Sequence, residues 1–140
     1  MKKPKISEVT AYFNSNVESV WNAVTNNIDY KWRSDIEKIE IVNAGKEFIE
    51  YTHRGNTTKF VITKNKKYSE YEFNMGNKMF TGFWTGHFSK TEIGGTKVIF
   101  NENIFVRNPI INALWYFFVD LKKIQNTYIL DLKKKLGEKL

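Results

Sequence analysis

Two glutamates occupy positions at which the alternation of a strand directs a side chain toward an apolar interior. Glu102 has the same parity as Phe100 and Ile104, and Glu50 has the same parity as Phe48. Alternate side chains of a strand share one face. A carboxyl group in apolar surroundings has its pKa raised by desolvation, so it can donate or accept a proton near neutral pH. Glu102 and Glu50 are therefore the candidates for acid–base catalysis.

A different arrangement is open for both glutamates. A β-bulge would turn Glu102 outward. A lysine at the rim of a pocket would pair with Glu102, and Arg54 would pair with Glu50. Such pairs keep a carboxylate ionised and give it no catalytic role.

Two polar residues interrupt the apolar pattern near the end of the chain. Gln125 and Tyr128 stand at positions where three- and four-residue spacing places a buried helix face. An amide and a phenol in such a place can bind the polar end of a small ligand. The alternative for Tyr128 is that its ring packs in the core while its hydroxyl reaches a carbonyl or solvent.

The remaining residue types exclude the common catalytic and metal-binding motifs. The chain has no cysteine, and its two histidines, His53 and His87, lack metal-ligand spacing. No serine lies in a nucleophile elbow, and the glycines at 94–95 precede a strand rather than a phosphate-binding helix. We expect no metal and no cofactor.

The composition is that of one domain, residues 1–140, with an excess of aromatic residues. Aromatic residues make up 16% of the chain, more than a compact core of this size needs and enough to line a cavity. The net charge is +7, but the lysines fall in separate segments, at 2–3, 64–67, 122–123 and 133–135. We therefore expect solvated lysine faces and no nucleic-acid partner.

The periodicity predicts one strand, two short helices and a meander of six strands. Residues Val9 to Phe13 alternate as in a strand with one covered face. Ser15 and Glu18 have the spacing of a capping box at the start of a helix, and a second helical piece covers Tyr30 to Arg33. From Lys38 to Arg107, turn signals separate six strands that are apolar on one face.

The apolar face of this sheet must be covered, and the last third of the chain supplies the cover. Asn108 can cap a helix whose first residue is Pro109. At about 1.5 Å per residue this helix would be on the order of 40 Å long. Its apolar stripe comprises Ile111, Leu114, Phe118, Leu121, Gln125, Tyr128, Leu132 and Leu136.

The same segment is too short and too polar to be a transmembrane helix. A bilayer requires about 20 consecutive apolar residues, whereas the run from 110 to 119 contains Asn112 and ends at Asp120. Contact of its lysine face with a membrane surface stays open. The chain begins without an apolar run of signal-peptide length, so we expect a cytoplasmic location.

Four segments resemble the SRPBCC, or START-like, superfamily of helix-grip proteins. "SNVESVWNAVTN" is similar to the first helix of that superfamily, and "WRSDIEKIEIV" to the entry into its second strand. "MFTGFWTGHF" and "QNTYILDLKKKLGEKL" are similar to its sheet centre and closing helix. The superfamily includes START-like lipid-transfer domains, polyketide cyclases and the birch-pollen allergen type.

The resemblance implies an α+β helix-grip fold. A seven-stranded curved antiparallel sheet would wrap a long C-terminal helix, with two short helices after the first strand and a cavity between sheet and helix. Gly82 and Gly86 flank Trp84 on the expected inner face, where they either leave room for a ligand or let the helix approach or the sheet bend. We expect a ligand to be bound by Trp84, Gly82, Phe88, Phe100, Glu102, Leu114, Phe118, Leu121, Gln125 and Tyr128.

Three functions are compatible with this fold. The first is binding or carrying a small hydrophobic or amphipathic molecule, without catalysis. The second is an enzyme of the polyketide cyclase or hydratase type that uses Glu102 or Glu50. The third is an interaction module similar to the heat-shock ATPase activators, which would meet an acidic partner. We rank the binder first because the pattern provides a cavity but no catalytic constellation; it does not specify an oligomeric state.

Overall fold

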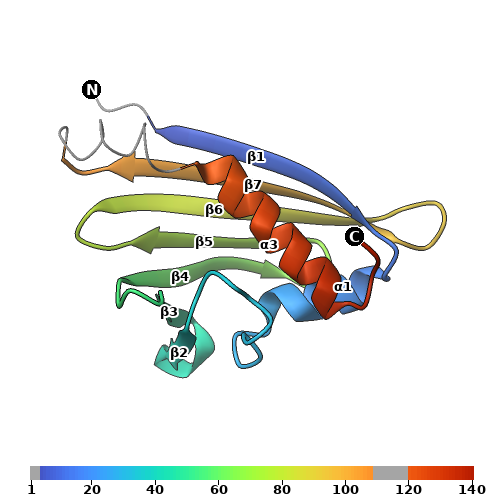
Figure 1. The fold of residues 1–140 in the computed structure, drawn as a ribbon, viewed down its shortest axis with the longest axis horizontal. Coiled ribbons are helices and arrows are strands. Elements are labelled where there is room, and N and C mark those ends of the chain that lie inside the picture. The colour runs from blue at the N-terminus through green and yellow to red at the C-terminus, as the bar shows by residue number, and fades with distance from the viewer. Residues whose placement is uncertain (1–3, 109–119) are drawn as a thin grey trace.

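The computed structural model describes residues 4–108 and 120–140 (Figure 1). One antiparallel sheet is crossed on one face by a helix, and a shorter helix lies at one end of the sheet. The elements are β1 (Lys5–Phe13), α1 (Val17–Thr25), β2 (Lys38–Val42), a 3-10 turn η1 (Asn43–Gly45), β3 (Glu47–Tyr51), β4 (Thr57–Lys66), β5 (Glu70–Gly76), β6 (Phe80–Lys90), β7 (Thr96–Val106) and α3 (Leu121–Lys135).

The sheet has seven strands in the order β1-β7-β6-β5-β4-β3-β2. The predicted six-strand meander is confirmed as β2 to β7, and β1 pairs with β7 as an edge strand of the open sheet. In that pair Val9 lies opposite Phe100. Strands β6 and β7 pair without a register shift from Phe80 to Lys90, so no bulge displaces Glu102 from the face that it shares with Phe100.

The apolar face of the sheet forms two adjoining hydrophobic clusters. The first joins β1, β5, β6 and β7 to α1 and α3, with Val20, Val98 and Leu132 fully buried. The second joins β3, β4, β5 and β7 to the start of α3, through Phe48, Phe60, Met75, Ile104, Val106 and Leu121. The two helices therefore cover one end and the middle of the sheet.

Helix α1 has a different N-cap from the one expected. Its cap is Asn16, whose side chain accepts a hydrogen bond from the Ser19 amide at 2.8 Å. Ser15 instead donates its hydroxyl and its amide to Glu138, at 2.6 and 3.0 Å. The predicted capping box is wrong because a residue from the opposite end of the chain binds Ser15.

The predicted second helix is also wrong. Residues Tyr30 to Arg33 form a single turn, closed by a hydrogen bond of 3.0 Å from the Arg33 amide to the Tyr30 carbonyl. No helix lies between α1 and β2. The loop that connects these elements is held by side-chain contacts, and it supplies part of the site described below.

Helix α3 begins later than expected. Asp120 has extended backbone angles and caps the helix by accepting a hydrogen bond from the Lys123 amide, so an uninterrupted helix from Pro109 to Leu136 is wrong. The helix of 15 residues is about 22 Å long. Positions 109–119 lie outside the described residues. The predicted cap at Asn108 with Pro109, and the predicted helix positions of Ile111, Leu114 and Phe118, therefore stay predictions.

Candidate ligand-binding site

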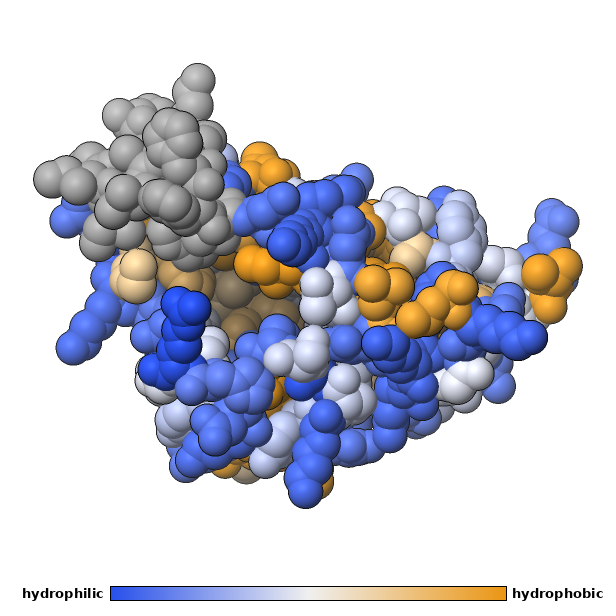
Figure 2. Space-filling view, viewed as in Figure 1, coloured by the Kyte–Doolittle hydropathy of each residue, from blue (hydrophilic) through white to orange (hydrophobic). Residues whose placement is uncertain are grey.

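A cavity of about 230 Å³ lies between the apolar face of the sheet and the first half of α3. Its described walls come from β3 to β7, from α3, and from the loop between α1 and β2. Figure 2 shows a hollow on this side of the molecule, with hydrophobic side chains inside it and hydrophilic ones along much of its described border.

Aromatic rings form the sheet side of the cavity. Phe48 stacks on Phe60 with ring centroids 4.7 Å apart, and Phe73 stacks on Trp84 at 4.8 Å. Phe100 packs against Trp84 at 4.9 Å. Because the rings lie on one another, they form a continuous apolar wall that suits the hydrophobic part of a ligand.

The two glycines of β6 allow close packing and do not line the cavity. A Cβ atom on Gly86 would lie 2.5 Å from the Trp84 ring and 3.3 Å from Phe100. A Cβ atom on Gly82 would meet the Asn103 carbonyl oxygen and the Ile104 side chain. The room at Gly86 is therefore taken by the Trp84 ring, and the prediction that Gly82 faces the ligand is not supported by its position.

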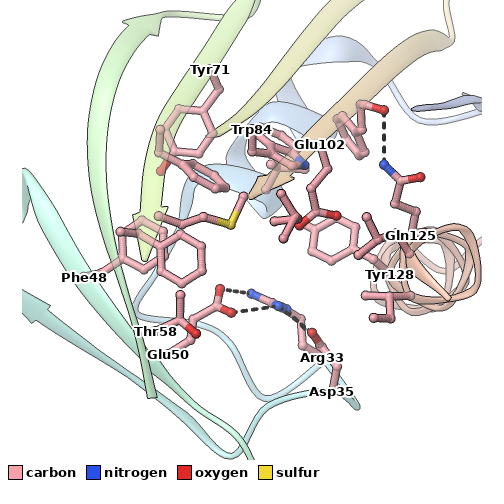
Figure 3. Close-up of a pocket in the computed structure, with 18 of the residues that line it drawn as sticks. Arg33, Asp35, Phe48, Glu50, Thr58, Tyr71, Trp84, Glu102, Gln125 and Tyr128 are labelled. Carbon is pink, nitrogen blue, oxygen red and sulfur yellow. Dashed lines mark hydrogen bonds and ion pairs between the residues drawn. The ribbon is translucent and has the colours of Figure 1, made fainter. Parts of the chain in front are cut away.

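One arginine occupies the polar end of the cavity. The Arg33 guanidinium donates to Asp35 at 3.1 and 2.7 Å and to Glu50 at 2.6 and 3.4 Å, as Figure 3 shows for its contacts with Glu50. It also lies 5.2 Å from the centre of the Tyr128 ring. Burial lowers the pKa of Arg33, but the charges of Glu50 and Asp35 together outweigh this effect and raise the pKa above its ordinary value. The guanidinium therefore stays charged. The partner of Glu50 is Arg33, while Arg54 is exposed.

The loop that carries Arg33 is fixed to α3 on both sides of that residue. Asp131 is buried and accepts hydrogen bonds from the Ser34 amide at 2.8 Å and the Ser34 hydroxyl at 2.7 Å. The Trp32 ring packs edge-on against Tyr128, with centroids 5.3 Å apart. These contacts position the guanidinium, and they place Asp131 inside the protein although its sequence position falls outside the apolar stripe.

Glu102 points into the same cavity from β7 (Figure 3). Among the described residues it has no hydrogen-bond or ion-pair partner. Burial raises its pKa from 4.5 to about 7, the charge of Glu50 adds to the rise, and Arg33 opposes it. Glu102 is partly exposed, and it lines the cavity. Near neutral pH this carboxyl group is partly protonated, so it can donate or accept a proton.

Two phenol groups and one amide add to the polar lining, which also includes Asn27 and Thr58. Tyr71 is 2% exposed, and its hydroxyl makes no well-formed hydrogen bond in the described part of the chain, although the Asn27 side chain lies near it. Burial raises the pKa of Tyr71 and of Tyr128, so both phenols are neutral at physiological pH. The Gln125 amide accepts from the Ser7 hydroxyl at 2.7 Å and donates to the Ser7 and Phe100 carbonyls at 3.0 and 3.4 Å. Gln125 therefore ties α3 to the sheet.

The structure brings most of the expected ligand-binding residues together, and their binding role stays a prediction. Phe88 lies apart, because it packs against Trp21 of α1 with centroids 4.9 Å apart. Leu114 and Phe118 lie outside the described residues. The cavity wall includes Trp84, Phe100, Glu102, Leu121, Gln125 and Tyr128, together with the second candidate carboxylate, Glu50.

Sequence reasoning missed the two charged residues of the α1–β2 loop, Arg33 and Asp35. Both line the cavity, but a loop has no periodicity from which the direction of its side chains can be deduced. The available signal was the tripeptide Arg-Ser-Asp at 33–35, in which Ser34 anchors the loop. Asp131, which accepts the hydrogen bonds of Ser34, lies 97 residues away in the sequence, so the sequence alone does not reveal this contact.

The described residues form neither a metal-binding cluster nor a membrane-spanning helix. Within residues 4–108 and 120–140, no cluster of histidine and carboxylate side chains has an arrangement that would hold a metal ion. No helix in this part of the chain has the length and apolar character needed to cross a membrane.

Neither a protein-family model nor a curated protein sequence matches the chain. The fold, in contrast, matches solved structures over nearly the whole chain. A START superfamily protein from Mycobacterium smegmatis is 12% identical, with a TM-score of 0.66 and coverage of 94% of this chain and 93% of that one. XoxI from Bacillus cereus is 17% identical, with a TM-score of 0.73 and coverage of 93% and 94%.

A plant enzyme has the same fold. Norcoclaurine synthase from Thalictrum flavum, solved in complex with dopamine and hydroxybenzaldehyde, is 13% identical, with a TM-score of 0.69 and coverage of 99% of this chain and 90% of that one. The chain thus has the START-like helix-grip fold, in which an antiparallel sheet packs against a C-terminal helix. At these identities the likeness concerns the fold.

Proposed function

We propose that the protein binds or carries a small amphipathic molecule in the cavity between the sheet and α3. The observation that carries the proposal is the cavity itself, since its aromatic wall and its polar end suit the two parts of such a ligand. Structural neighbours support this use of the fold, because norcoclaurine synthase holds dopamine and hydroxybenzaldehyde. A cytoplasmic location stays a prediction from the sequence.

The volume is a guide to the size of a test ligand, although the cavity opens to solvent on one side (Figure 2). A cavity of about 150 Å³ accommodates benzene, which corresponds to roughly 25 Å³ for each carbon atom. At 230 Å³, the cavity accommodates about nine non-hydrogen atoms by the same ratio. A short-chain alcohol such as 1-octanol is therefore a suitable probe.

Two measurements test the proposal. Native mass spectrometry of the protein purified from its own host should detect a bound small molecule. Calorimetric titration with 1-octanol should show saturable binding that the Thr58→Phe variant loses, because Thr58 lies on the cavity wall and the added ring fills the space. Thr57→Phe is the matched control, since Thr57 is exposed and the same ring then points away from the cavity. Absence of both a native ligand and saturable octanol binding would contradict the proposal.

An enzyme of the cyclase or hydratase type is the second candidate, and Glu102 is the observation that favours it. A carboxyl group with a pKa of about 7 inside a substrate-sized cavity has the properties of a general acid or base. Activity of this kind would change with pH around 7 and would be lost in Glu102→Gln. Full activity in that variant would exclude this role.

A further inference from the structure

The polar end of the cavity contains more carboxylates than cations. Among the described residues of its lining, Asp35, Glu50 and Glu102 carry carboxyl groups, and Arg33 carries the positive charge. With Asp35 and Glu50 ionised, Arg33 balances one of them. The charge of this region is therefore negative before Glu102 ionises and becomes more negative when it does.

Arg33 has little capacity left to bind an anionic ligand. Four hydrogen bonds join its guanidinium to Asp35 and Glu50, out of the five N–H donors that an arginine possesses. An incoming carboxylate would compete with these partly buried internal partners and leave one of them without its counter-charge, which is unfavourable. It would also approach the carboxyl group of Glu102.

Two groups on the cavity wall make no well-formed hydrogen bond in the described part of the protein. The Glu102 carboxyl group has neither a hydrogen bond nor an ion pair with any residue that the structure describes. The Tyr71 hydroxyl is buried and makes no well-formed hydrogen bond within residues 4–108 and 120–140, and the Asn27 side chain lies near it. Glu102 keeps accessible surface and lines the cavity, so its carboxyl group can be reached by the polar end of a ligand. Tyr71 lies on the same cavity wall. The position of these two groups on the cavity wall is independent of the excess of carboxylates over cations.

We propose that the cavity prefers an amphipathic ligand whose polar end is a protonated amine, and that Glu102 is the residue that pairs with it. The proposal rests on the function proposed above and adds the charge of the ligand. An ammonium group supplies the donors and the positive charge that Glu102 lacks. A neutral alcohol supplies only one donor, and a fatty acid brings a second negative charge.

The preference depends on pH through Glu102. The groups that act on its pKa are Glu50 and Arg33, and the same cavity contains Asp35, Tyr71 and Tyr128. The phenols remain neutral near pH 7, and an alkyl amine remains protonated. With a pKa of about 7, the ionised fraction of Glu102 is about tenfold larger at pH 8 than at pH 6. The affinity for an ammonium ligand rises by the same factor.

Calorimetry with three probes of matched size tests the proposal. Octylamine, 1-octanol and heptanoate each have about nine non-hydrogen atoms, which suits the cavity volume. At pH 8 we expect octylamine to bind at least about tenfold more tightly than 1-octanol, because charge-assisted hydrogen bonds are stronger than neutral ones. Heptanoate should bind most weakly. From pH 6 to pH 8 the octylamine affinity should rise about tenfold, and that of 1-octanol should change little.

Two variants assign the effect to Glu102. In Glu102→Gln, octylamine should lose both its advantage over 1-octanol and its pH dependence, while 1-octanol still binds. Glu72→Gln removes the same charge near Lys64, outside the cavity lining, and should behave as the unmodified protein. Unchanged octylamine binding in Glu102→Gln would overturn the proposal.

The outcomes distinguish this proposal from the function on which it rests. If 1-octanol binds in the cavity and octylamine binds no more tightly, or if heptanoate binds best, the charge preference is wrong and the proposed binding function stands. If none of the three probes binds and native mass spectrometry detects no bound molecule, both are wrong.

Discussion

Replacing Glu102 by glutamine should stabilise the protein, by an amount that grows with pH. Folding raises the pKa of this carboxyl group from 4.5 to about 7, so the folded state holds its proton more tightly than the unfolded chain. As pH rises through this range the unfolded state ionises first, and the folded state loses stability relative to it. Above pH 7 the ionisation of Glu102 lowers the free energy of unfolding by about 3 kcal/mol. At pH 5 it lowers the free energy of unfolding by about 1 kcal/mol. Below pH 4 the contribution disappears.

Urea unfolding of the unmodified protein and of Glu102→Gln, followed by tryptophan fluorescence at pH 5, 6, 7 and 8, measures this effect. Any change in packing caused by the amide is the same at each pH, so the pH-dependent part reports the ionisation alone. The stability advantage of the variant should increase by about 2 kcal/mol from pH 5 to pH 8. Parallel stability curves for the two proteins would refute the conclusion that Glu102 lies in an apolar cavity with a raised pKa.

Three further substitutions test the packing around the cavity. Arg33→Met leaves two partly buried carboxylates without their partner and should lower the free energy of unfolding by about 1–3 kcal/mol. The exposed Arg54→Met should change it by less than about 0.5 kcal/mol, and equal effects in urea unfolding would contradict this. Gly86→Ala forces the neighbouring tryptophan ring to move and should destabilise the folded protein by about 1–3 kcal/mol. The control is Gly76→Ala, whose new Cβ atom has its nearest contact at 3.5 Å and which should be nearly neutral in thermal unfolding. Tyr71→Phe removes a hydroxyl that makes no well-formed hydrogen bond to the described residues, so stability should stay unchanged or rise by up to about 1 kcal/mol. A loss of more than about 1 kcal/mol would show that the hydroxyl is hydrogen-bonded, with nearby Asn27 as the candidate partner.

The strands and the direction of Glu102 could be predicted because they follow from a local rule. Alternation assigns each side chain of a strand to one of two faces, and the unbroken pairing of β6 with β7 preserves that assignment along the whole strand. The turn signals between 38 and 107 then divide the segment into six strands. For the same reason, the aromatic wall could be expected before the structure was known.

The elements that were mispredicted depend on contacts between distant residues. Ser15 resembles a helix cap, but Glu138 binds it and Asn16 caps the helix instead. Arg33 reaches the cavity because Asp131 anchors Ser34, 97 residues away. Local propensity contains no information about such partners, so the polar end of the site could not be derived from the pattern that predicts the sheet.

The start of α3 illustrates a local signal that was present but outweighed. Asp120 is a favourable N-cap residue, and it accepts from the Lys123 amide. The apolar spacing on both sides of Asp120 nevertheless suggested one uninterrupted helix. A capping residue inside a periodic segment is therefore a reason to expect a new helix to start.

The central claim is that the space between the sheet and α3 accepts a small amphipathic molecule with its polar end at Glu102. A crystal structure of the protein grown with octylamine tests it most directly. The account predicts an alkyl chain against Trp84, with the amine nitrogen within hydrogen-bond distance of the Glu102 carboxylate. A structure in which the protein's own rings fill this space, or in which octylamine lies only on the outer surface, would contradict it.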